Sequence, residues 1–346
     1  MIDNREEKII DFIRETGKCS SKEIFEEVDI SVSYATLKRI ITKLKSDNYI
    51  DSVGRGKGTK YILSPAFKLI QPIDIEKYYE KEIDERQIKG DFNFKIITEV
   101  LNVYSAFTEN ELNKLALVQK EYESNVSKLS DNEYNNELER LAIDLSWKSS
   151  QIEGNTYSLL ETERLLKEKE TASGKSSEEA IMLLNHKEAI DFIIEHNDYL
   201  NPLTVSKIED IHSILRKGLN VERNLRKRRV GISGTNYKPL DNEFQILEAL
   251  GYTCDVINNK ESVFEKALLA LVLISYIQPF IDGNKRTARI VSNAILMNYD
   301  YCPLSFRTVD SIDYKKAMLL FYEQNNISNF KEIFKTQFEF AVRTYF

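Results

Sequence analysis

Residues 278–289 of this 346-residue chain read QPFIDGNKRTAR and place a carboxylate and several cations around a Gly-Asn turn. Pro279 prevents the preceding apolar helix from continuing, so we expect a new helix to begin at the turn. The free backbone N–H groups at a helix start bind anions, but Lys285, Arg286 and Arg289 oppose the helix dipole at that same end. A bound polyphosphate would remove this conflict. The residues therefore predict a phosphate site.

Asp282 immediately precedes that turn. A carboxylate beside phosphate oxygens is an arrangement in which proteins commonly hold Mg²⁺, so Asp282 is the predicted metal ligand. The three histidines, His186, His196 and His212, lie at helical positions without matching carboxylate or cysteine neighbours. We expect these imidazoles to have structural roles and not to bind a metal.

Three stretches of the chain resemble Fic domains. QPFIDGNKRTAR resembles the active-site motif HxFx(D/E)GN(G/K)RxxR. Upstream, SSQIEGN at 149–155 resembles the inhibitory helix motif (S/T)xxxE(G/N) of self-inhibited members. Between them, a segment resembles the flap that aligns the target protein, with Arg226, Val230, Ile232 and Tyr237-Lys238-Pro239 as the matching residues. The resemblance covers about residues 70–340, which also include the fitting positions Asn185, His212 and Tyr314.

The resemblance implies a mainly α fold, an all-helical Fic fold with a small β-hairpin flap. It also implies a protein adenylyltransferase, which moves AMP from Mg-ATP to a Ser, Thr or Tyr hydroxyl of a protein and releases pyrophosphate. The chain itself is one candidate acceptor, and a homodimer is left open. Removal of AMP from a modified protein is a related activity, in which Glu153 would position a water molecule.

Carried over by residue, the resemblance assigns a role to each position of the motif. Phe280 would anchor the loop in the core, and Asp282 would hold Mg²⁺. Arg286 and Arg289 would neutralise the β- and γ-phosphates. The nucleotide-binding set implied by the motif is Gly283, Asn284, Lys285, Arg286 and Arg289, and the catalytic positions are Gln278, Asp282, Asn284, Arg286 and Arg289.

The resemblance also implies self-inhibition. Glu153 would reach Arg289 and keep the γ-phosphate from its productive place, since a carboxylate can form a bidentate pair with the guanidinium that ATP would otherwise occupy. Ser149, Gly154 and Asn155 complete the matching motif. The alternative is that Glu153 simply ends a helix before a glycine cap.

Two positions depart from the family pattern. Gln278 occupies the place of the motif histidine, which takes the proton of the attacking hydroxyl. A glutamine amide cannot accept that proton near neutral pH, and a missing general base typically costs about 10²- to 10⁴-fold in rate. We therefore expect the chain to bind Mg-ATP but to transfer slowly or not at all. The sequence leaves open whether Gln278 is natural or introduced.

Lys285 is the second departure, because adenylylating members commonly have glycine there. Glycine lets the backbone approach the phosphates closely, whereas lysine adds bulk and charge. The Doc branch, which transfers phosphate, carries lysine at this place. AMP transfer is thus the first expectation, with a Doc-like phosphotransferase as the alternative.

Residues 33–61 carry seven lysines and arginines against two aspartates, within a chain of net charge −7. A local basic patch is typical of nucleic-acid binding. Three short helices followed by a Gly-rich hairpin resemble a winged helix-turn-helix, in which the third helix enters the major groove and the wing touches phosphate. The predicted base-edge residues are Ser33, Tyr34 and Thr36, and the predicted phosphate contacts are Lys38, Arg39, Arg55 and Lys57.

This N-terminal unit raises two alternatives. Small winged helices also serve as protein-interaction modules, and exposed basic residues are often merely solvated. Combined with Gln278, the basic patch also allows a DNA-binding regulator whose Fic domain senses ATP without turnover. That regulator would change its DNA affinity with ATP and form no covalent product.

The remaining sequence predicts the elements that position these residues. The composition, 42% hydrophobic and 30% charged, is typical of a globular protein, and 12 glycines and 6 prolines in this length favour long helices. We expect three parts: a winged helix at 1–64, a linker at 65–93 and the Fic domain at 94–346, with the inhibitory helix near 133–153. The expected helices of the last part are 94–104, 108–124, 133–152, 159–169, 177–196, 203–217, 243–258, 262–277, 285–299, 311–324 and 329–343, with Val230 to Tyr237 read as an irregular hairpin.

The sequence also predicts where the protein acts. The apolar run from Ala267 to Ile277 is shorter than the roughly 20 residues of a membrane span, so no membrane partner is expected. The first ten residues show no export signal. Three widely spaced cysteines fit a reducing compartment and offer no zinc pattern. A cytoplasmic protein is the expectation.

Overall fold

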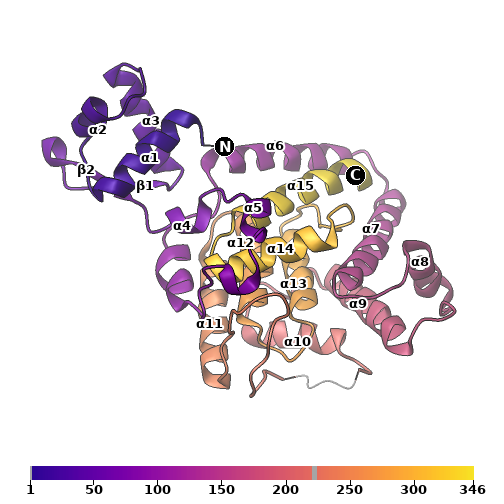
Figure 1. Cartoon of the computed structure of the whole chain (residues 1–346). Helices are drawn as coiled ribbons and strands as arrows, with labels where there is room; N and C mark the ends of the chain where they lie inside the picture. The colour runs from indigo at the N-terminus through magenta and orange to yellow at the C-terminus, as the bar shows by residue number, and fades with distance from the viewer. Residues whose placement is uncertain (1, 220–223) are drawn as a thin grey trace.

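The computed structural model describes residues 2–219 and 224–346, and the side chain of Lys57 is outside the description. Its first unit consists of three helices and a hairpin, which stand to one side of a larger helical body (Figure 1). Ser20 and Ser33 cap the second and third helices through their hydroxyls. The elements of this unit are α1 (Asn4–Thr16), α2 (Ser21–Glu27), α3 (Tyr34–Ser46), β1 (Ile50–Val53), the 3-10 turn η1 (Gly56–Gly58) and β2 (Lys60–Leu63).

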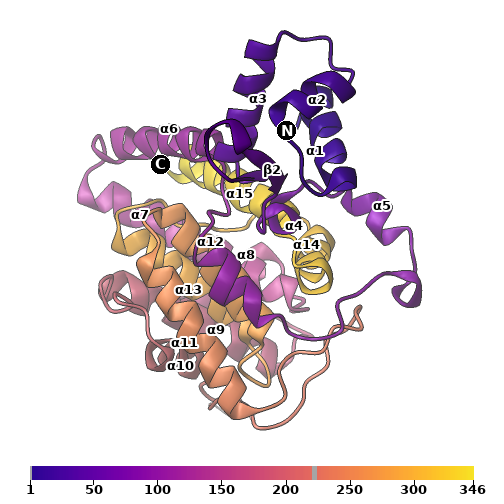
Figure 2. The same cartoon turned by 90° about the vertical axis from the view of Figure 1, so that its left-hand side faces the viewer.

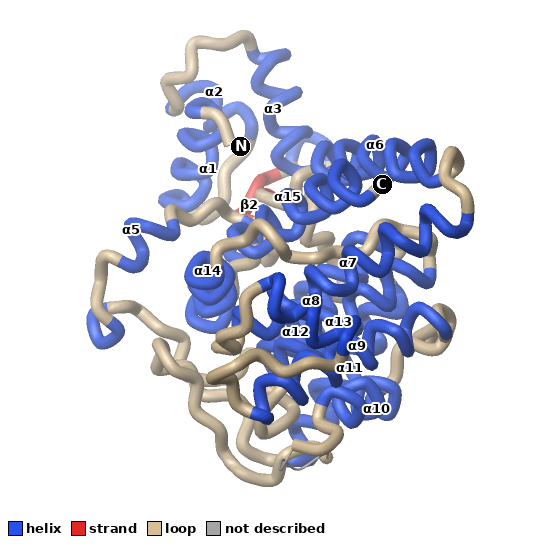
Figure 3. The backbone as a smooth tube through the Cα atoms, turned by 90° about the vertical axis from the view of Figure 1, so that its right-hand side faces the viewer, coloured by secondary structure: helices blue, strands red, loops and turns tan. Residues whose placement is uncertain are grey.

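The two strands pair antiparallel, with Ile50 opposite Leu63 and Val53 opposite Lys60. Figure 3 shows them as the strands of an otherwise helical chain. The mainly helical class is therefore confirmed, with its one antiparallel hairpin in the N-terminal unit. The expected hairpin at Val230 to Tyr237 is wrong, because no strand is assigned there. Just beyond this segment, Lys238 forms an isolated parallel β-bridge with Asp91.

The helical body is built around α12 (Val263–Ile277), all of whose residues are buried. Beyond Glu265 and Lys266 in its first turn, its sequence VFEKALLALVLISYI is apolar on nearly all faces, as expected for a central helix with neighbours on every side. The helices around it agree closely with the expected ones. They are the π-helix η3 (Ile96–Leu101), α6 (Glu109–Val126), α7 (Asp131–Ile152), α8 (Leu159–Glu168), α9 (Ser177–Glu195), α10 (Val205–Leu215), α11 (Glu243–Asn259), α13 (Asn284–Asn298), α14 (Ser311–Gln324) and α15 (Ser328–Tyr345).

The segment expected as a linker is packed against the body and contains short helices of its own. It includes α4 (Phe67–Ile70), α5 (Ile75–Tyr79) and the 3-10 turn η2 (Ile83–Glu85). Figure 2 shows α4 lying close to α14 and α15, and Glu76 of α5 forms an ion pair with Lys316 of α14 at 2.9 Å. The backbone N–H of Ile327 donates to Leu69 O at 2.7 Å. These contacts make the segment part of the folded body.

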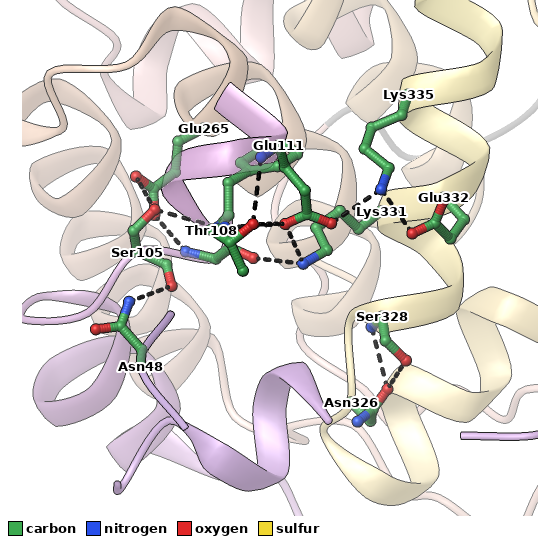
Figure 4. A network of polar contacts seen from close by, with 12 residues as sticks. Asn48, Ser105, Thr108, Glu111, Glu265, Asn326, Ser328, Lys331, Glu332 and Lys335 are labelled. Carbon is green, nitrogen blue, oxygen red and sulfur yellow. Dashed lines mark hydrogen bonds and ion pairs between the residues drawn. The ribbon is translucent and has the colours of Figure 1, made fainter. Parts of the chain in front are cut away.

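A polar network lies between the N-terminal unit and the body (Figure 4). Asn48 Nδ2 donates to Ser105 O at 3.4 Å, and the Ser105 hydroxyl donates to Glu265 Oε2 at 3.2 Å. On the other side of this network, Glu111 accepts from Lys331 at 2.8 Å and from Lys335 at 2.9 Å.

In the part of the chain that the structure describes, no helix combines the length and the apolar character of a membrane span.

Candidate functional site

The loop between α12 and α13 contains two residues in the left-handed region. Gln278 ends α12 with φ of 52°, and Gly283 precedes α13 with φ of 85°. A Cβ on Gly283 would lie 3.5 Å from both Arg216 Cδ and the His212 ring. The conformation and the close neighbours together explain why glycine fits this position. Helix α13 begins directly after this turn, at Asn284, as the sequence predicted.

Asn284 and Phe280 fix the loop from inside. The Asn284 amide accepts from the Phe280 N–H at 2.8 Å and donates to the Phe280 carbonyl at 2.8 Å. The Phe280 ring is fully buried and stacks on His212, with centroids 3.6 Å apart and planes within 2°. His212 Nε2 lies 2.9 Å from Asp282 O. The polar atoms of Asn284, predicted to contact phosphates, thus hold the loop in this structure.

The carboxylate of Asp282 lies between two guanidinium groups. Its Oδ2 is 2.6 Å from Arg216 Nη1 and 3.0 Å from Arg286 Nη2, while 54% of the side chain is exposed. Arg216 directly follows α10. The sequence analysis missed it because only the fold brings it to this loop. In the described part of the chain, no group of three His, Cys, Asp or Glu could hold a metal by itself. Asp282 is thus a single exposed carboxylate, which suits an ion shared with phosphate oxygens.

Arg286 and Arg289 of α13 are buried, and some of their N–H groups donate no hydrogen bond. Among the described atoms, Arg286 Nε and Nη1 and Arg289 Nη1 have no hydrogen-bond partner. Burial lowers the pKa of Arg286, and the opposite charge of Asp282 offsets only part of this lowering. Buried guanidinium donors without partners are costly to a fold unless a ligand completes them. They are unpartnered cationic donors of the kind that an anionic ligand completes, although Arg286 and Arg289 are buried and Lys285 is the α13 cation that lines the neighbouring cavity.

Glu153 lies directly after α7 and faces the start of α13. Its Oε1 is 3.0 Å from Arg289 Nη2, and its Oε2 is 3.3 Å from Lys285 Nζ. Burial by itself raises the pKa of Glu153, but the charges of Arg289 and Lys285 outweigh burial and leave the pKa below its ordinary value. The carboxylate is therefore ionised at neutral pH and occupies two of the cations.

Ser149 orients the same arginine through both of its oxygens. Its hydroxyl accepts from Arg289 Nε at 2.8 Å, and its carbonyl accepts from Arg289 Nη2 at 3.0 Å. His186 Nε2 lies 2.7 Å from the Ser149 hydroxyl. Burial, with Arg289 and Arg286 nearby, places the pKa of His186 well below its ordinary value. The neutral imidazole therefore accepts the Ser149 proton, a structural role for His186 that agrees with the sequence analysis.

The other two residues of the predicted inhibitory motif end α7. Gly154 has φ of 102°. The Asn155 amide donates to Glu179 O at 3.0 Å, and its Oδ1 accepts from the Tyr157 N–H at 3.0 Å. Gly154 and Asn155 thus turn the chain away after Glu153. Glu153 therefore both ends α7 and contacts α13, so the two interpretations of this residue are compatible.

A cavity of about 340 Å³ opens beside these groups. Glu153, Asp282, Gly283, Asn284 and Lys285 are among its lining residues. A further set, from α14, was missed by the sequence analysis, although spacings of three, one and three place these residues on one helical face. These lining residues of α14 are Lys315, Met318, Leu319 and Tyr322.

Gln278 lines the cavity with its side chain held in place. Its Nε2 donates to Ser275 O at 2.6 Å and lies 3.3 Å from the Tyr322 hydroxyl. Its Oε1 accepts from Asn284 Nδ2 at 3.0 Å. An amide bonded at both ends provides no atom that binds a proton near neutral pH.

The structure separates the predicted flap residues. Ile232 lines the cavity together with Gly231 and Ser233. Val230 instead lines a different hollow, and Tyr237 is buried with its hydroxyl donating to Tyr276 O at 3.1 Å. Of the three, only Ile232 is brought to the cavity.

Arg226 comes directly before the flap and is fully buried. Its Nε donates to Gln278 O at 2.6 Å, and its Nη1 donates to Arg228 O at 2.9 Å. The side chain therefore ties the segment that leads into the flap to the end of α12.

The predicted DNA contacts lie on α3 and in the loop of the hairpin, away from the residues of this cavity. Ser33 caps α3 by accepting from Thr36 N at 3.2 Å. Tyr34 OH and Lys38 Nζ both bond to the Ser21 hydroxyl, at 2.9 and 2.7 Å. The side chains of Arg39 and Arg55 are exposed, and the Lys57 side chain lies outside the described part of the structure.

Comparison with known proteins agrees with the motif. Residues 202–296 match the model of the Fic/DOC family. The chain is 30% identical over 198 residues to a protein adenylyltransferase Fic of Nematostella vectensis, covering 54% of this chain and 43% of the relative. It is 29% identical to a protein of the same name from Aedes aegypti, covering 44% of this chain and 32% of the relative. The chain thus spans less than half the length of these curated relatives.

Solved structures show the same fold. Fic-1 of C. elegans (aa134–508) superposes with a TM-score of 0.56 at 18% identity, covering 68% of this chain and 70% of that chain. A Fic domain-containing signaling protein from Bacteroides thetaiotaomicron gives a TM-score of 0.56 at 19% identity, covering 68% of this chain and 95% of that chain. At these identities the similarity concerns the fold alone.

Proposed function

Since this chain contains a Fic domain, we propose that it is a protein adenylyltransferase that moves AMP from ATP to a protein hydroxyl. The observation that carries this proposal is the start of α13, where Arg286 Nε and Nη1 and Arg289 Nη1 are buried and have no hydrogen-bond partner among the described atoms. The adjoining cavity is large enough for part of a nucleotide. The names of the curated relatives support the same class of enzyme.

The residues present fit a magnesium nucleotide. Asp282 would hold Mg²⁺, which when bound shields the phosphate charge. Arg286 and Arg289 bind and orient the polyphosphate, and the backbone N–H groups after Gly283 add the positive end of α13. In the transfer, the acceptor oxygen forms a bond to the α-phosphorus while the bond from that phosphorus to the bridging oxygen breaks. Pyrophosphate leaves, and the hydroxyl proton must go to a base.

Gln278 occupies the position where that base is expected. Its amide is bonded to Ser275 and Asn284 and cannot take the proton. The chain as it stands therefore transfers AMP slowly, by about 10²- to 10⁴-fold relative to a chain with histidine there. Ile232 in the flap would help to align the target segment beside this residue.

Glu153 supports a self-inhibited state. Its carboxylate occupies Arg289 and Lys285, the cations that a γ-phosphate would use. ATP must displace it to bind productively. Charge-assisted pairs of this kind are the stronger hydrogen bonds in proteins, so displacement reduces the apparent affinity for ATP.

A second candidate is an ATP-sensing regulator that binds DNA without turnover. Three helices and an antiparallel hairpin at the N-terminus, with Arg39 and Arg55 exposed, favour it. In that case α3 would enter the major groove and the hairpin loop would touch phosphate. Lys38, hydrogen-bonded to Ser21, would have to exchange that bond for a phosphate.

The test is intact mass after incubation with Mg-ATP. The chain carries Gln278→His and Glu153→Gly, and the matched control also carries Arg289→Ala. Gain of one AMP in the test chain and none in the control supports the proposal. Gain of one phosphate shows a Doc-like phosphotransferase in which Lys285 matters. An unchanged mass with tight ATP binding, when a target protein has also been supplied, favours the regulator.

A further inference from the structure

The segment that joins the N-terminal unit to the body also contacts the flap, here residues 230–237. Arg86 lies at the junction, with Nη1 3.3 Å from the Glu323 carboxylate of α14. Its Nη2 donates to Gly234 O at 3.1 Å. The exposed fractions of the Arg86 and Glu323 side chains are 4% and 0%. One buried guanidinium thus bridges α14 and the flap.

Two further hydrogen bonds join the same segments. Asn236 Nδ2 donates to Asp84 Oδ1 at 3.1 Å. The Lys238 N–H, at the end of the flap, donates to Gly90 O at 2.9 Å. Contacts spread over residues 84–90 of the connecting segment therefore reach residues 234–238, which follow the part of the flap that lines the cavity.

The flap is closely packed where Arg86 reaches it. Gly234 has φ of 88°, and a Cβ there would lie 3.3 Å from Leu319 Cδ1 of α14. Leu319 itself lines the cavity, as do Ile232 and Ser233 directly before Gly234. Movement of the Gly234 carbonyl would therefore change the wall of the cavity.

The other end of the connecting segment is attached to the N-terminal unit. The ring of Phe67 in α4 lies 6.2 Å from the ring of Tyr49, edge to face, and the Arg14 guanidinium lies 5.5 Å from it. Tyr79, in α5, lies 4.9 Å from the Arg86 guanidinium. The connecting segment thus packs against the N-terminal unit at α4 and against Arg86 at α5.

We propose that Arg86 is a positioning residue, through which the connecting segment holds the flap at the cavity. Its guanidinium presents separate N–H groups in different directions, so it can form an ion pair with Glu323 and a hydrogen bond to Gly234 O at once, which a lysine ammonium does less well. The consequence for alignment of a target protein rests on the proposed function, whereas the attachment of the flap does not.

The test is hydrogen–deuterium exchange on the full chain without nucleotide. Arg86→Gln is expected to raise the exchange rate of the amides in 231–238 by about tenfold. A change of this size corresponds to the loss of one hydrogen bond of ordinary strength. Arg86→Lys should keep the ion pair and the melting temperature but still raise exchange in the flap. The matched control is Glu76→Gln, which removes an exposed ion pair of the same segment, 2.9 Å from Lys316 on α14.

Unchanged exchange in 231–238 for both Arg86 variants would overturn the proposal. An increase spread evenly over the chain would also overturn it, because it would show a general loss of stability. A functional arm uses the chain with Gln278→His and Glu153→Gly, where adding Arg86→Gln should slow AMP incorporation and adding Glu76→Gln should not. If that reference chain incorporates no AMP, the proposed function fails and the exchange experiment still decides the role of Arg86.

Discussion

Glu153 Oε2 lies 3.3 Å from Lys285 Nζ, while the other oxygen of the same carboxylate lies 3.0 Å from Arg289 Nη2. Lys285 and Arg289 are four residues apart on α13 and so project from the same face. Lys285, which stands where the family resemblance leads us to expect glycine, is thus also a partner of Glu153. Under the proposed function, its charge would add to the attraction that ATP has to overcome.

Lys285→Met is expected to tighten ATP binding by about 3- to 10-fold, because a partly buried ion pair of order 1 kcal/mol no longer holds Glu153. In a Glu153→Gly chain the same substitution should leave binding equal or weaken it, since there Lys285 can only attract phosphate. Calorimetric Kd values for Mg-ATP with the four chains measure this. Equal changes in both backgrounds would show that the two residues are not coupled.

Ser149→Ala should destabilise the protein by about 1–3 kcal/mol, because it removes the hydroxyl between Arg289 and His186 and leaves their buried nitrogens without a partner. Ser150 provides a matched control. It is equally buried and its hydroxyl has no partner among the described atoms, so Ser150→Ala should be close to neutral. Urea denaturation of both variants makes the comparison, and similar losses would contradict it.

Arg226→Met should lower the free energy of unfolding by about 2–4 kcal/mol, since the carbonyls of Gln278 and Arg228 lose a charged donor inside the protein. Arg229→Met is the control. Arg229 is 85% exposed and pairs with Asp241, so its loss should change stability by less than about 1 kcal/mol. Thermal unfolding distinguishes them, and an Arg226→Met chain as stable as the control would refute the assigned contact.

Stability should fall in acid partly through Glu111. Burial raises its pKa, but Lys331 and Lys335 outweigh burial and lower the pKa from 4.5 to about 2. A lowered folded-state pKa means that this stabilisation is complete above about pH 5 and is lost as the pH falls toward 2. Glu111→Gln should therefore destabilise by about 2 kcal/mol at pH 7 and by much less near pH 2.

Denaturation at several pH values checks this, with Glu99→Gln as the control. Glu99 pairs with Lys95 at 3.8 Å and is 64% exposed, so its removal should matter little at any pH. A destabilisation by Glu111→Gln that is the same at pH 7 and near pH 2 would contradict the role of its charge.

Much of this protein follows from local sequence. The apolar spacing along Val263–Ile277 predicts a buried helix, and Pro279 with the Gly-Asn turn predicts its end and the start of α13 at Asn284. These features depend on neighbours in the chain, because helix periodicity, proline and turn residues act over a few residues. The motif residues from Gln278 to Arg289 could be found for the same reason.

Other features depend on contacts between distant residues. Arg216, the α14 side of the cavity and Arg86 have no local pattern that marks them, and only packing brings them to the site. At the segment expected as a hairpin, Val230 to Tyr237, backbone groups bond to the connecting segment instead of to a facing strand: Gly234 O accepts from Arg86, and the Lys238 N–H just beyond the segment donates to Gly90 O. Backbone groups of a short Gly-containing segment take whichever partners the fold supplies. The sequence alone therefore determined the helices and the loop between α12 and α13, whereas tertiary structure decided which distant groups surround them.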